Sequence, residues 1–598
     1  WSSMSSALYA LGTWAVARRK LVVGLWAGLL VALGVLAGLL HQPINDVFTI
    51  PGTQSQRAMD ALTARFPEFA GASGQVVVSA PAGSKVTDPA VTARIEDLTA
   101  RYAALPHVRT AASPFNPNIV GAVSPDASVA IISVQLDTDA ANVTEAIRDP
   151  LIQTAHDATA AGLPTSIGGA IFMPSAPEMS ITEGLGVLVA LIVLVATFGS
   201  ALAAGIPLAT AVIGVGASMG LILIATRFTA ITSTAPFLAL MIGLAVGIDY
   251  ALFVLSRHRD LIAEGQTPDE AAAQATGTAG SAVVFAGATV AIALAALGVA
   301  GVPFLSVMGV AAAVAVAVAV AVALTLLPAI LGFAGDRLTP KHTADAHHAK
   351  RHTSFAATWV RLVTRLPWLT AIVVVAGLAA MALPARDLAL ALPNNGTSGP
   401  ETTQRQAFDT IATAFGPGAN APLVITLDIV TTTDPLGVVA DVKKLVADTP
   451  GIASISVATP NRGADTGVVI AVPTTAPDAQ QTRDTLARVR ALGPEIERLH
   501  PGVTLAVTGH TAAQVDISER LGGALLPFGI LVVGLSLVLL MLVFRSLLVP
   551  VTAALGYVLS VGAAFGAVSA VFRWGWLLAP FGLTETGPVI AFMPIILM

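Results

Sequence analysis

APFLALMIGLAVGIDYALFVLS, residues 235–256, is a run of 22 residues in which Asp249 is the only charged side chain. A helix needs about 20 consecutive apolar residues to cross a bilayer, so this run predicts a membrane span. A carboxyl group inside such a helix is costly, and residues of this kind usually face the interior of a helix bundle and mark an ion or proton path. We therefore expect other membrane helices to surround Asp249.

The composition of the whole chain agrees with a membrane protein. Of its 598 residues, 55% are hydrophobic and 11% are charged, whereas soluble proteins carry about 25% charged residues. The net charge of −5 gives no basic surface for nucleic acid. The chain has no cysteine, which excludes disulfides, thiolate metal ligands and cysteine nucleophiles.

Further apolar runs predict eight more spans before a tenth that begins near Thr586. Two of these runs are long enough for two helices each, and the others fit one helix each. The runs are residues 21–40, 184–226 (two), 271–335 (two), 366–383, 521–544 and 546–572.

The positive charges set the orientation of these spans. Arg18 to Lys20, the pair Arg257 and Arg259, and the segment 341–365 all fall on one side, which the positive-inside rule makes cytoplasmic. The two long polar stretches, 41–183 and 384–520, then face outward. Each alternates strand-like runs with helical ones, so each predicts an α+β domain. The predicted strands include 75–79, 129–136, 423–429 and 467–472, and residues 481–499 predict a helix.

These boundaries divide the chain into alternating membrane and aqueous segments. They are the N-terminus with span one (1–40), a first periplasmic α+β domain (41–183), spans two to six (184–335), a cytoplasmic linker (336–365), span seven (366–383), a second periplasmic α+β domain (384–520), and spans eight and nine with the start of span ten (521–598).

The chain also repeats itself at an offset near 345 residues. Thr13-Trp14 corresponds to Thr358-Trp359, and Phe198-Gly199-Ser200 corresponds to Phe544-Arg545-Ser546. Each half is one span, an outer domain and a helix bundle, which is the parallel kind of transporter repeat. By this alignment the counterpart of Asp249 falls just beyond Met598. We therefore expect the chain to be part of a twelve-span protein.

Asp249 and Tyr250 are the candidate proton relay. The apolar surroundings disfavour the charged carboxylate, which makes reversible protonation of Asp249 feasible, and the Tyr250 hydroxyl could extend the path. Ser281 and Thr289 on the fifth span could hydrogen-bond to this relay, although bonds to their own helix are the simpler expectation.

Gly243 and Gly247 are four residues apart. This spacing of small residues lets a neighbouring helix approach closely, so both glycines are assigned to helix packing near the relay. His342, His347, His348 and His352 crowd the cytoplasmic linker but have no regular ligand spacing, so no metal site is expected. The sequence lacks a Gly-Lys dipeptide and an H-E-x-x-H pair. We expect no enzyme activity and no cofactor, and an ion gradient as the energy source.

The segment Gly243-Leu244-Ala245-Val246-Gly247-Ile248-Asp249-Tyr250-Ala251-Leu252-Phe253 resembles the mycobacterial membrane protein large (MMPL) branch of the resistance–nodulation–division superfamily. Further similar marks are Pro51 to Arg57 and Phe544-Arg545-Ser546. The resemblance covers essentially the whole chain. It implies a polytopic α-helical protein with two parallel six-span repeats, of which the second is incomplete here, and two α+β porter-like periplasmic domains.

The resemblance further implies proton-driven export of lipids or other hydrophobic molecules across the inner membrane of a bacterium. In the family, Asp-Tyr pairs of spans four and ten form the relay. Asp249 and Tyr250 match the first pair, and the second pair would lie beyond Met598. Alanine-rich runs such as 311–323 suggest an actinobacterial genome.

Two other functions remain open at this point. One is a lipid- or sterol-sensing membrane protein related to Patched. The other is a protein-translocation accessory resembling SecD and SecF. The Asp-Tyr pair followed by Arg257-His258-Arg259 matches the MMPL pattern better than it matches such an accessory. Expected partners are membrane lipids or a hydrophobic small molecule and no nucleic acid. A homo-oligomer or accessory envelope proteins are compatible with the sequence.

Overall fold

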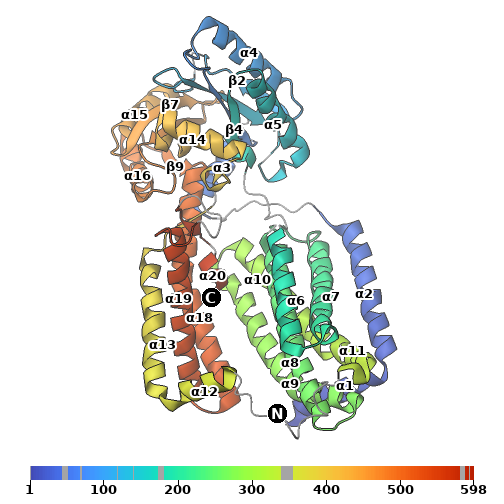
Figure 1. The fold of residues 1–598 in the computed structure, drawn as a ribbon. Helices are drawn as coiled ribbons and strands as arrows, with labels where there is room; N and C mark the ends of the chain where they lie inside the picture. Colours follow the sequence, from blue (N-terminus) through green and yellow to red (C-terminus); the bar gives the residue numbers. More distant parts are fainter. Residues whose placement is uncertain are drawn as a thin grey trace.

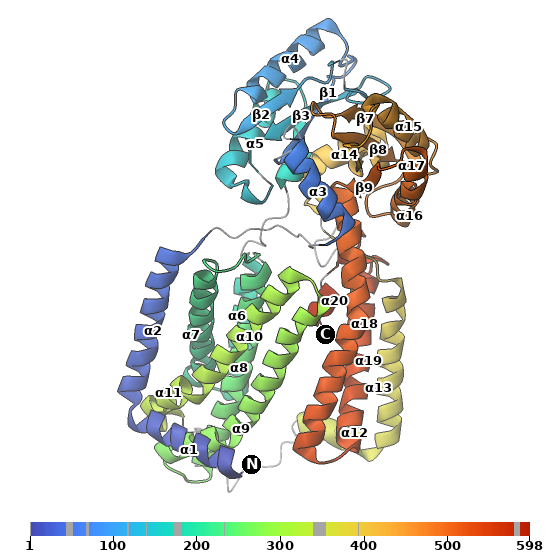
Figure 2. The same cartoon turned by 180° about the vertical axis from the view of Figure 1, so that it is seen from behind.

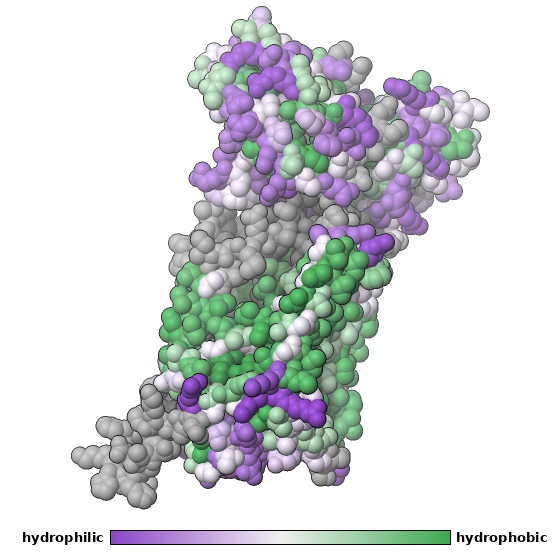
Figure 3. All heavy atoms as spheres, turned by 90° about the vertical axis from the view of Figure 1, so that its right-hand side faces the viewer, coloured by the Kyte–Doolittle hydropathy of each residue, from purple (hydrophilic) through white to green (hydrophobic). Residues whose placement is uncertain are grey.

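The computed structural model describes residues 2–42, 52–66, 71–116, 119–138, 140–172, 181–232, 234–338, 355–392, 394–578, 586–591 and 593–597. Two sets of long helices run side by side, and two α+β domains sit on one end of them (Figure 1). Among the described residues, eight helices are long and apolar enough to cross a membrane, and Gly184–Phe198 is a shorter apolar helix. On the face shown in Figure 3, a hydrophobic surface covers the helices between polar surfaces at both ends. The protein is thus a polytopic membrane protein.

The first set of helices surrounds α10, which packs against α7, α8 and α9. A helix in the middle of a bundle has no polar face, which explains the run of alanine and valine in α10. The set consists of α1 (Ser2–Ala17), α2 (Arg19–Leu40), α6 (Ile181–Phe198), α7 (Ala201–Ala225), α8 (Thr234–Ala263), α9 (Pro268–Ala295), α10 (Pro303–Leu324) and α11 (Leu326–Ala334).

The second set contains the longest helix, α18. Its 35 residues span about 52 Å at 1.5 Å per residue, so it reaches from the second α+β domain through the whole membrane belt (Figure 2). Hydropathy predicted that this helix starts near residue 521, because residues 510–520 are polar. In the structure these residues already belong to α18 and lie in the α+β domain. The set consists of α12 (Phe355–Arg365), α13 (Pro367–Ala382), α18 (His510–Phe544), α19 (Leu548–Phe572) and α20 (Met593–Leu597).

The two α+β domains share one topology. Each has a four-stranded antiparallel sheet, in the order β2-β3-β1-β4 in the first domain and β7-β8-β6-β9 in the second, so equivalent strands occupy equivalent places. The first domain contains β1 (Ser73–Ser79), α4 (Pro89–Ala103), β2 (Val108–Ala112), β3 (Val129–Leu136), α5 (Glu145–Ala160) and β4 (Thr165–Gly169). The second contains β6 (Leu423–Asp428), α15 (Pro435–Ala447), β7 (Ile452–Pro460), β8 (Thr466–Pro473), α16 (Gln480–Arg490), α17 (Gly493–Leu499) and β9 (Thr504–Thr508).

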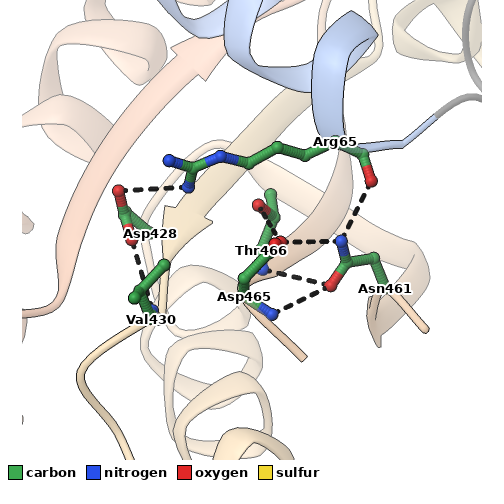
Figure 4. A network of polar contacts seen from close by, with 6 residues as sticks. All are labelled: Arg65, Asp428, Val430, Asn461, Asp465 and Thr466. Atoms are coloured by element: carbon green, nitrogen blue, oxygen red, sulfur yellow. Dashed lines mark hydrogen bonds and ion pairs between the residues drawn. The ribbon is translucent and has the colours of Figure 1, made fainter. Parts of the chain in front are cut away.

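The domains exchange one helix each. The helix α3 (Gln54–Arg65) precedes the first domain in sequence but packs against β9 of the second domain. Its last residue, Arg65, forms an ion pair with Asp428 at 3.2 Å, and its carbonyl accepts a hydrogen bond from the Asn461 side chain at 2.9 Å (Figure 4). Leu62 and Phe66 pack against Val468 beneath these contacts.

The reciprocal exchange is made by α14 (Thr403–Phe415), which lies on the first domain. The Thr403 hydroxyl accepts a hydrogen bond from the backbone N–H of Ile167 at 2.9 Å. Ala407 and Ile411 of α14 form a buried cluster with Val77 and Val129 of the first sheet. Because each domain contributes a helix to the other, the two domains form one connected outer structure.

The turns after spans two and eight show the repeat at the level of single residues. Gly199 ends α6 with φ at +65°, and Arg545, at the equivalent place after α18, has φ at +49°. The left-handed region is comfortable for glycine but rare for other residues. The second repeat therefore keeps a backbone conformation that its arginine does not favour, which is strong evidence that the turn geometry is shared.

Two details differ from the sequence predictions, and one is confirmed. The predicted helix 481–499 is two helices, α16 and α17, because Pro494 can occupy the first turn of a helix but not its interior. The cytoplasmic linker 336–365 contains a helix, α12, over its last residues. The strand predicted at 129–136 is confirmed as β3 (Val129–Leu136).

The tenth span does not begin near Thr586, contrary to the prediction. The described residues after 585 first form β10 (Val589–Ile590), which pairs in parallel with β5 (Leu390–Ala391), and α20 begins only at Met593. Pro588 disfavours a helical conformation for the residue before it, and Pro594 falls in the first turn of α20, where its missing N–H costs nothing. An extended segment, paired with the strand β5 that follows span seven, thus precedes α20.

Replacing Tyr102 by phenylalanine is expected to destabilise the first domain by about 1 to 2 kcal/mol. Tyr102 is fully buried, and its hydroxyl donates to the Leu151 carbonyl at 3.0 Å, tying α4 to α5. Burial raises the pKa of this hydroxyl above its ordinary value of 10.0, so it remains a donor throughout the neutral range. Hydrogen exchange should be faster in α4 and α5 of the variant, and unchanged in Tyr9→Phe, whose ring is exposed.

Candidate proton-relay site in the membrane helices

The helix that carries the candidate relay, α8, is held between α7, α10 and α9. Gly247 lets α7 approach most closely, since a Cβ atom there would lie 3.0 Å from Cβ and 3.1 Å from Cα of Ala211. At Gly243 a Cβ atom would lie 3.4 Å from Cβ of Ala315 and 3.4 Å from Cγ2 of Val215, which is the short end of the ordinary van der Waals range. The two glycines therefore line the packed side of α8, and Gly247 has the less room of the two.

Tyr250 points into the first set of helices. Only 7% of the residue is exposed, and it belongs to a buried apolar cluster that includes Val254 and Val283. The ring edge fits beside Gly287 of α9, where a Cβ atom would lie 3.5 Å from Cε2 of Tyr250. Among the described residues, the Tyr250 hydroxyl forms no hydrogen bond, and its neighbours in this cluster are apolar.

Asp249 lies near the middle of α8 and points in a different direction. Successive residues of a helix are rotated by about 100°, so Asp249 and Tyr250 leave the helix on different sides. Asp249 is exposed, in a stripe that also contains Met241 and Phe253, which are 52% and 55% exposed. In the part of the chain that the structure describes, the carboxylate forms no hydrogen bond or ion pair.

The side of α8 that Asp249 occupies follows from Ile242. Ile242 is half-buried and packs against an apolar cluster that has members in α8 and α10 and also in α18 and α20. Asp249 is seven residues further along α8, and therefore about two turns and about 10 Å away on nearly the same face. Asp249 thus lies on an exposed side of α8. The sequence predicted it inside one bundle, where other membrane helices would surround it.

Ser281 and Thr289 bond to their own helix. The Ser281 hydroxyl donates to the Thr278 carbonyl at 2.7 Å, and the Thr289 hydroxyl donates to the Ala286 carbonyl at 2.7 Å. Neither hydroxyl is bonded to Asp249 or Tyr250. The structure therefore brings Gly247 and Tyr250 into one packed region, and it leaves Ser281 and Thr289 without a direct link to the relay.

The cytoplasmic end of α8 contains one residue whose role the sequence did not reveal. His258 lies between Arg257 and Arg259, which set the orientation, but it is fully buried, and its Nε2 lies 3.2 Å from the Pro268 carbonyl. Arg259 instead caps α6, donating to the Phe198 carbonyl at 3.1 Å. The spacing Tyr250, Val254, His258 places His258 on the packed face of α8, and this periodicity was the available signal.

No metal-binding group of three or more His, Asp or Glu side chains exists among the described residues. The four linker histidines, His342, His347, His348 and His352, lie outside the described residues.

Two repeats of membrane helices, each with an α+β domain of the same topology, and an acid within one of the apolar helices define a multi-pass cell-membrane protein of the transporter type. The MMPL family model matches residues 47–370 and 398–579. This chain belongs to the MMPL family.

The chain is similar to several characterised or named proteins. It is 37% identical over 595 residues to "Membrane protein YdfJ" of Bacillus subtilis, covering 99% of this chain and 81% of that protein. It is 29% identical to "Mycolic acid-containing lipids exporter MmpL11" of Mycolicibacterium smegmatis, covering 94% and 60% respectively. It is 31% identical to "Heme uptake protein MmpL11" of Mycobacterium tuberculosis, covering 88% and 56%. The chain thus spans less than two thirds of the mycobacterial relatives.

Proposed function

We propose that this protein exports lipids or other hydrophobic molecules toward the periplasm and cell envelope, driven by the proton-motive force. The observation that carries the proposal is Asp249, an exposed carboxylate near the middle of an apolar helix. An ionisable group within a membrane span indicates a functional role, because a charged side chain there costs free energy that an uncharged side chain in a purely structural role would not cost. The proposal assigns reversible protonation to Asp249 and an adjoining role in the proton path to Tyr250.

Protonation would change how the two repeats pack. The charged carboxylate disfavours close apolar contact, and the neutral acid permits it, so the proton biases the helices between two arrangements. Each proton charge that moves down the membrane potential supplies about 2.3 kcal/mol per 100 mV. The long helix α18 extends from the membrane into the second α+β domain, and it provides a direct route for this change to reach the outer domains.

A hydrophobic cargo is supported by an apolar cavity between α18 and α19. Its volume is about 590 Å³, and its lining is apolar apart from Tyr557, with Val533, Leu537, Val561 and Phe565 among the lining residues. This volume is in the usual range of ligand sites. The name of the Mycolicibacterium smegmatis relative, a lipid exporter, points to the same class of cargo.

The experiment compares the envelope lipids of the host with and without the full-length gene. In the deletion strain we expect one lipid class to accumulate several-fold on the inner side of the membrane, and the wild-type gene to restore its distribution. Mass spectrometry of separated inner and outer lipid pools measures this. Unchanged lipid pools would contradict export and favour a sensor or a translocation accessory. Loss of growth on heme with unchanged lipids would favour heme transport, as named for one relative.

A further inference from the structure

The side chain of Asp516 joins two elements of the second α+β domain. It lies on α18 less than two turns after the helix begins at His510, and 9% of the side chain is exposed. Arg490, the last residue of α16, donates two hydrogen bonds to it: Nη1 to Oδ1 at 2.7 Å and Nη2 to Oδ2 at 3.0 Å. Such a bidentate pair fixes both the distance and the orientation of its partners.

A third element reaches the same carboxylate from the other half of the chain. The Ser55 hydroxyl donates to Oδ2 of Asp516 at 2.5 Å, and the Ser55 backbone N–H donates to the same oxygen at 3.3 Å. Ser55 is 2% exposed and lies in the first turn of α3, the exchanged helix that follows the membrane helix α2. The Ser55 carbonyl also accepts from the Thr508 hydroxyl at 2.7 Å.

We propose that Asp516 is a positioning residue that couples the membrane helices of both repeats to the outer domains. Through one carboxylate, α18 holds α16 of its own domain and the start of α3, which is connected to α2 of the first repeat. A movement of α18 then moves the exchanged helix together with the second domain. This role rests on the proposed transport function, because coupling has meaning only if the membrane helices drive the outer domains.

The contacts at the far end of α3 cannot fill this role. The Arg65–Asp428 ion pair lies at the opposite end from the membrane connection, and its two side chains are 38% and 47% exposed (Figure 4). Exposed ion pairs contribute little and hold their partners loosely. A carboxylate that is shielded from water and receives several hydrogen bonds holds its partners much more firmly.

The test uses the full-length protein, in which the absence of cysteine from these 598 residues simplifies labelling. Spin labels at Ala61→Cys on α3 and Glu519→Cys on α18 report the distance between the two helices by pulsed electron paramagnetic resonance. This pair is measured in the wild-type background, in Ser55→Ala and in Asp516→Asn. The matched control is Ser113→Ala, which removes a serine–carboxylate bond of 2.6 Å to Glu96 that is exposed and lies within one domain.

We expect a narrow distance distribution in the wild type and in Ser113→Ala, and a broadened one in Ser55→Ala and Asp516→Asn. The same two variants should lower the maximal rate of lipid export by about tenfold, as expected for the loss of a charge-assisted hydrogen bond, with an unchanged apparent KM. Wild-type rates in Ser55→Ala would overturn the proposal, and so would a lowered rate with a narrow distribution. If the wild type moves no lipid, the export proposal fails, while the distance distributions still decide whether Asp516 holds α3.

Discussion

Asp249→Asn is expected to reduce lipid export by at least about 100-fold while the protein remains in the membrane at its normal level. Removal of a group that takes part in proton transfer typically costs about 10² to 10⁴ in rate. Asparagine has nearly the same shape as aspartate but cannot bind and release a proton in the relevant range. Because Asp249 is exposed on α8 and makes no hydrogen bond or ion pair with the described residues, its loss removes no observed structural contact.

The matched control for this variant lies on the same helix. Asp260→Asn changes another exposed carboxylate of α8, eleven residues closer to its end, and is expected to export at the wild-type rate. The measurement is the fraction of radiolabelled lipid that reaches the outer leaflet of intact cells, normalised to the amount of protein in the membrane. Export by Asp249→Asn at a rate within twofold of the wild type would show that the carboxylate does not carry the proton.

Gly247→Leu is expected to destabilise the membrane helices by about 3 kcal/mol, because overpacking of a tight helix contact forces backbone shifts. A Cβ atom at Gly247 already comes within 3.1 Å of the Ala211 backbone, which cannot move aside as a flexible side chain can. Thermal unfolding of the detergent-solubilised protein should therefore begin at a temperature lower by about 5 °C or more.

Gly34→Leu is the control for this change. Gly34 is also a glycine within a membrane helix, but no atom lies within 4 Å of a Cβ placed there. We expect Gly34→Leu to unfold like the wild type, and Gly243→Ala, with 3.4 Å of room, to fall between the two. An equal unfolding temperature for Gly247→Leu and Gly34→Leu would show that α7 and α8 do not pack as closely as described.

The membrane architecture could be predicted from the sequence because hydropathy along the chain is a strong local signal. Each span is a continuous apolar run, and the fold class and family membership predicted from these runs and from residues 243–253 are confirmed. The start of α18 and the connector before α20 could not be found in this way. Residues 510–520 continue a membrane helix into a polar domain, and Val589 pairs with Leu390, nearly 200 residues away.

The residues of the candidate site could be predicted from the sequence, but the directions in which their side chains point could not. Hydropathy identifies Asp249 as an acid in an apolar helix, yet which side of α8 it occupies depends on packing around Gly247 and Ile242. Helix exchange between the α+β domains depends on contacts across several hundred residues, such as that of Ser55 with Asp516. These contacts leave no local pattern, because serine and aspartate are common in any polar segment.

The most direct test of proton-driven export is made with purified full-length protein in proteoliposomes that contain a pH-sensitive dye and a fluorescent lipid. A pH gradient is imposed, and proton flux and lipid transfer are recorded together. We predict that wild-type lipid transfer requires the gradient, is accompanied by proton flux and stops when a protonophore is added, and that Asp249→Asn shows neither signal. Lipid transfer that continues without a gradient, or proton-coupled transfer by Asp249→Asn, would contradict the assignment of the proton path to this carboxylate.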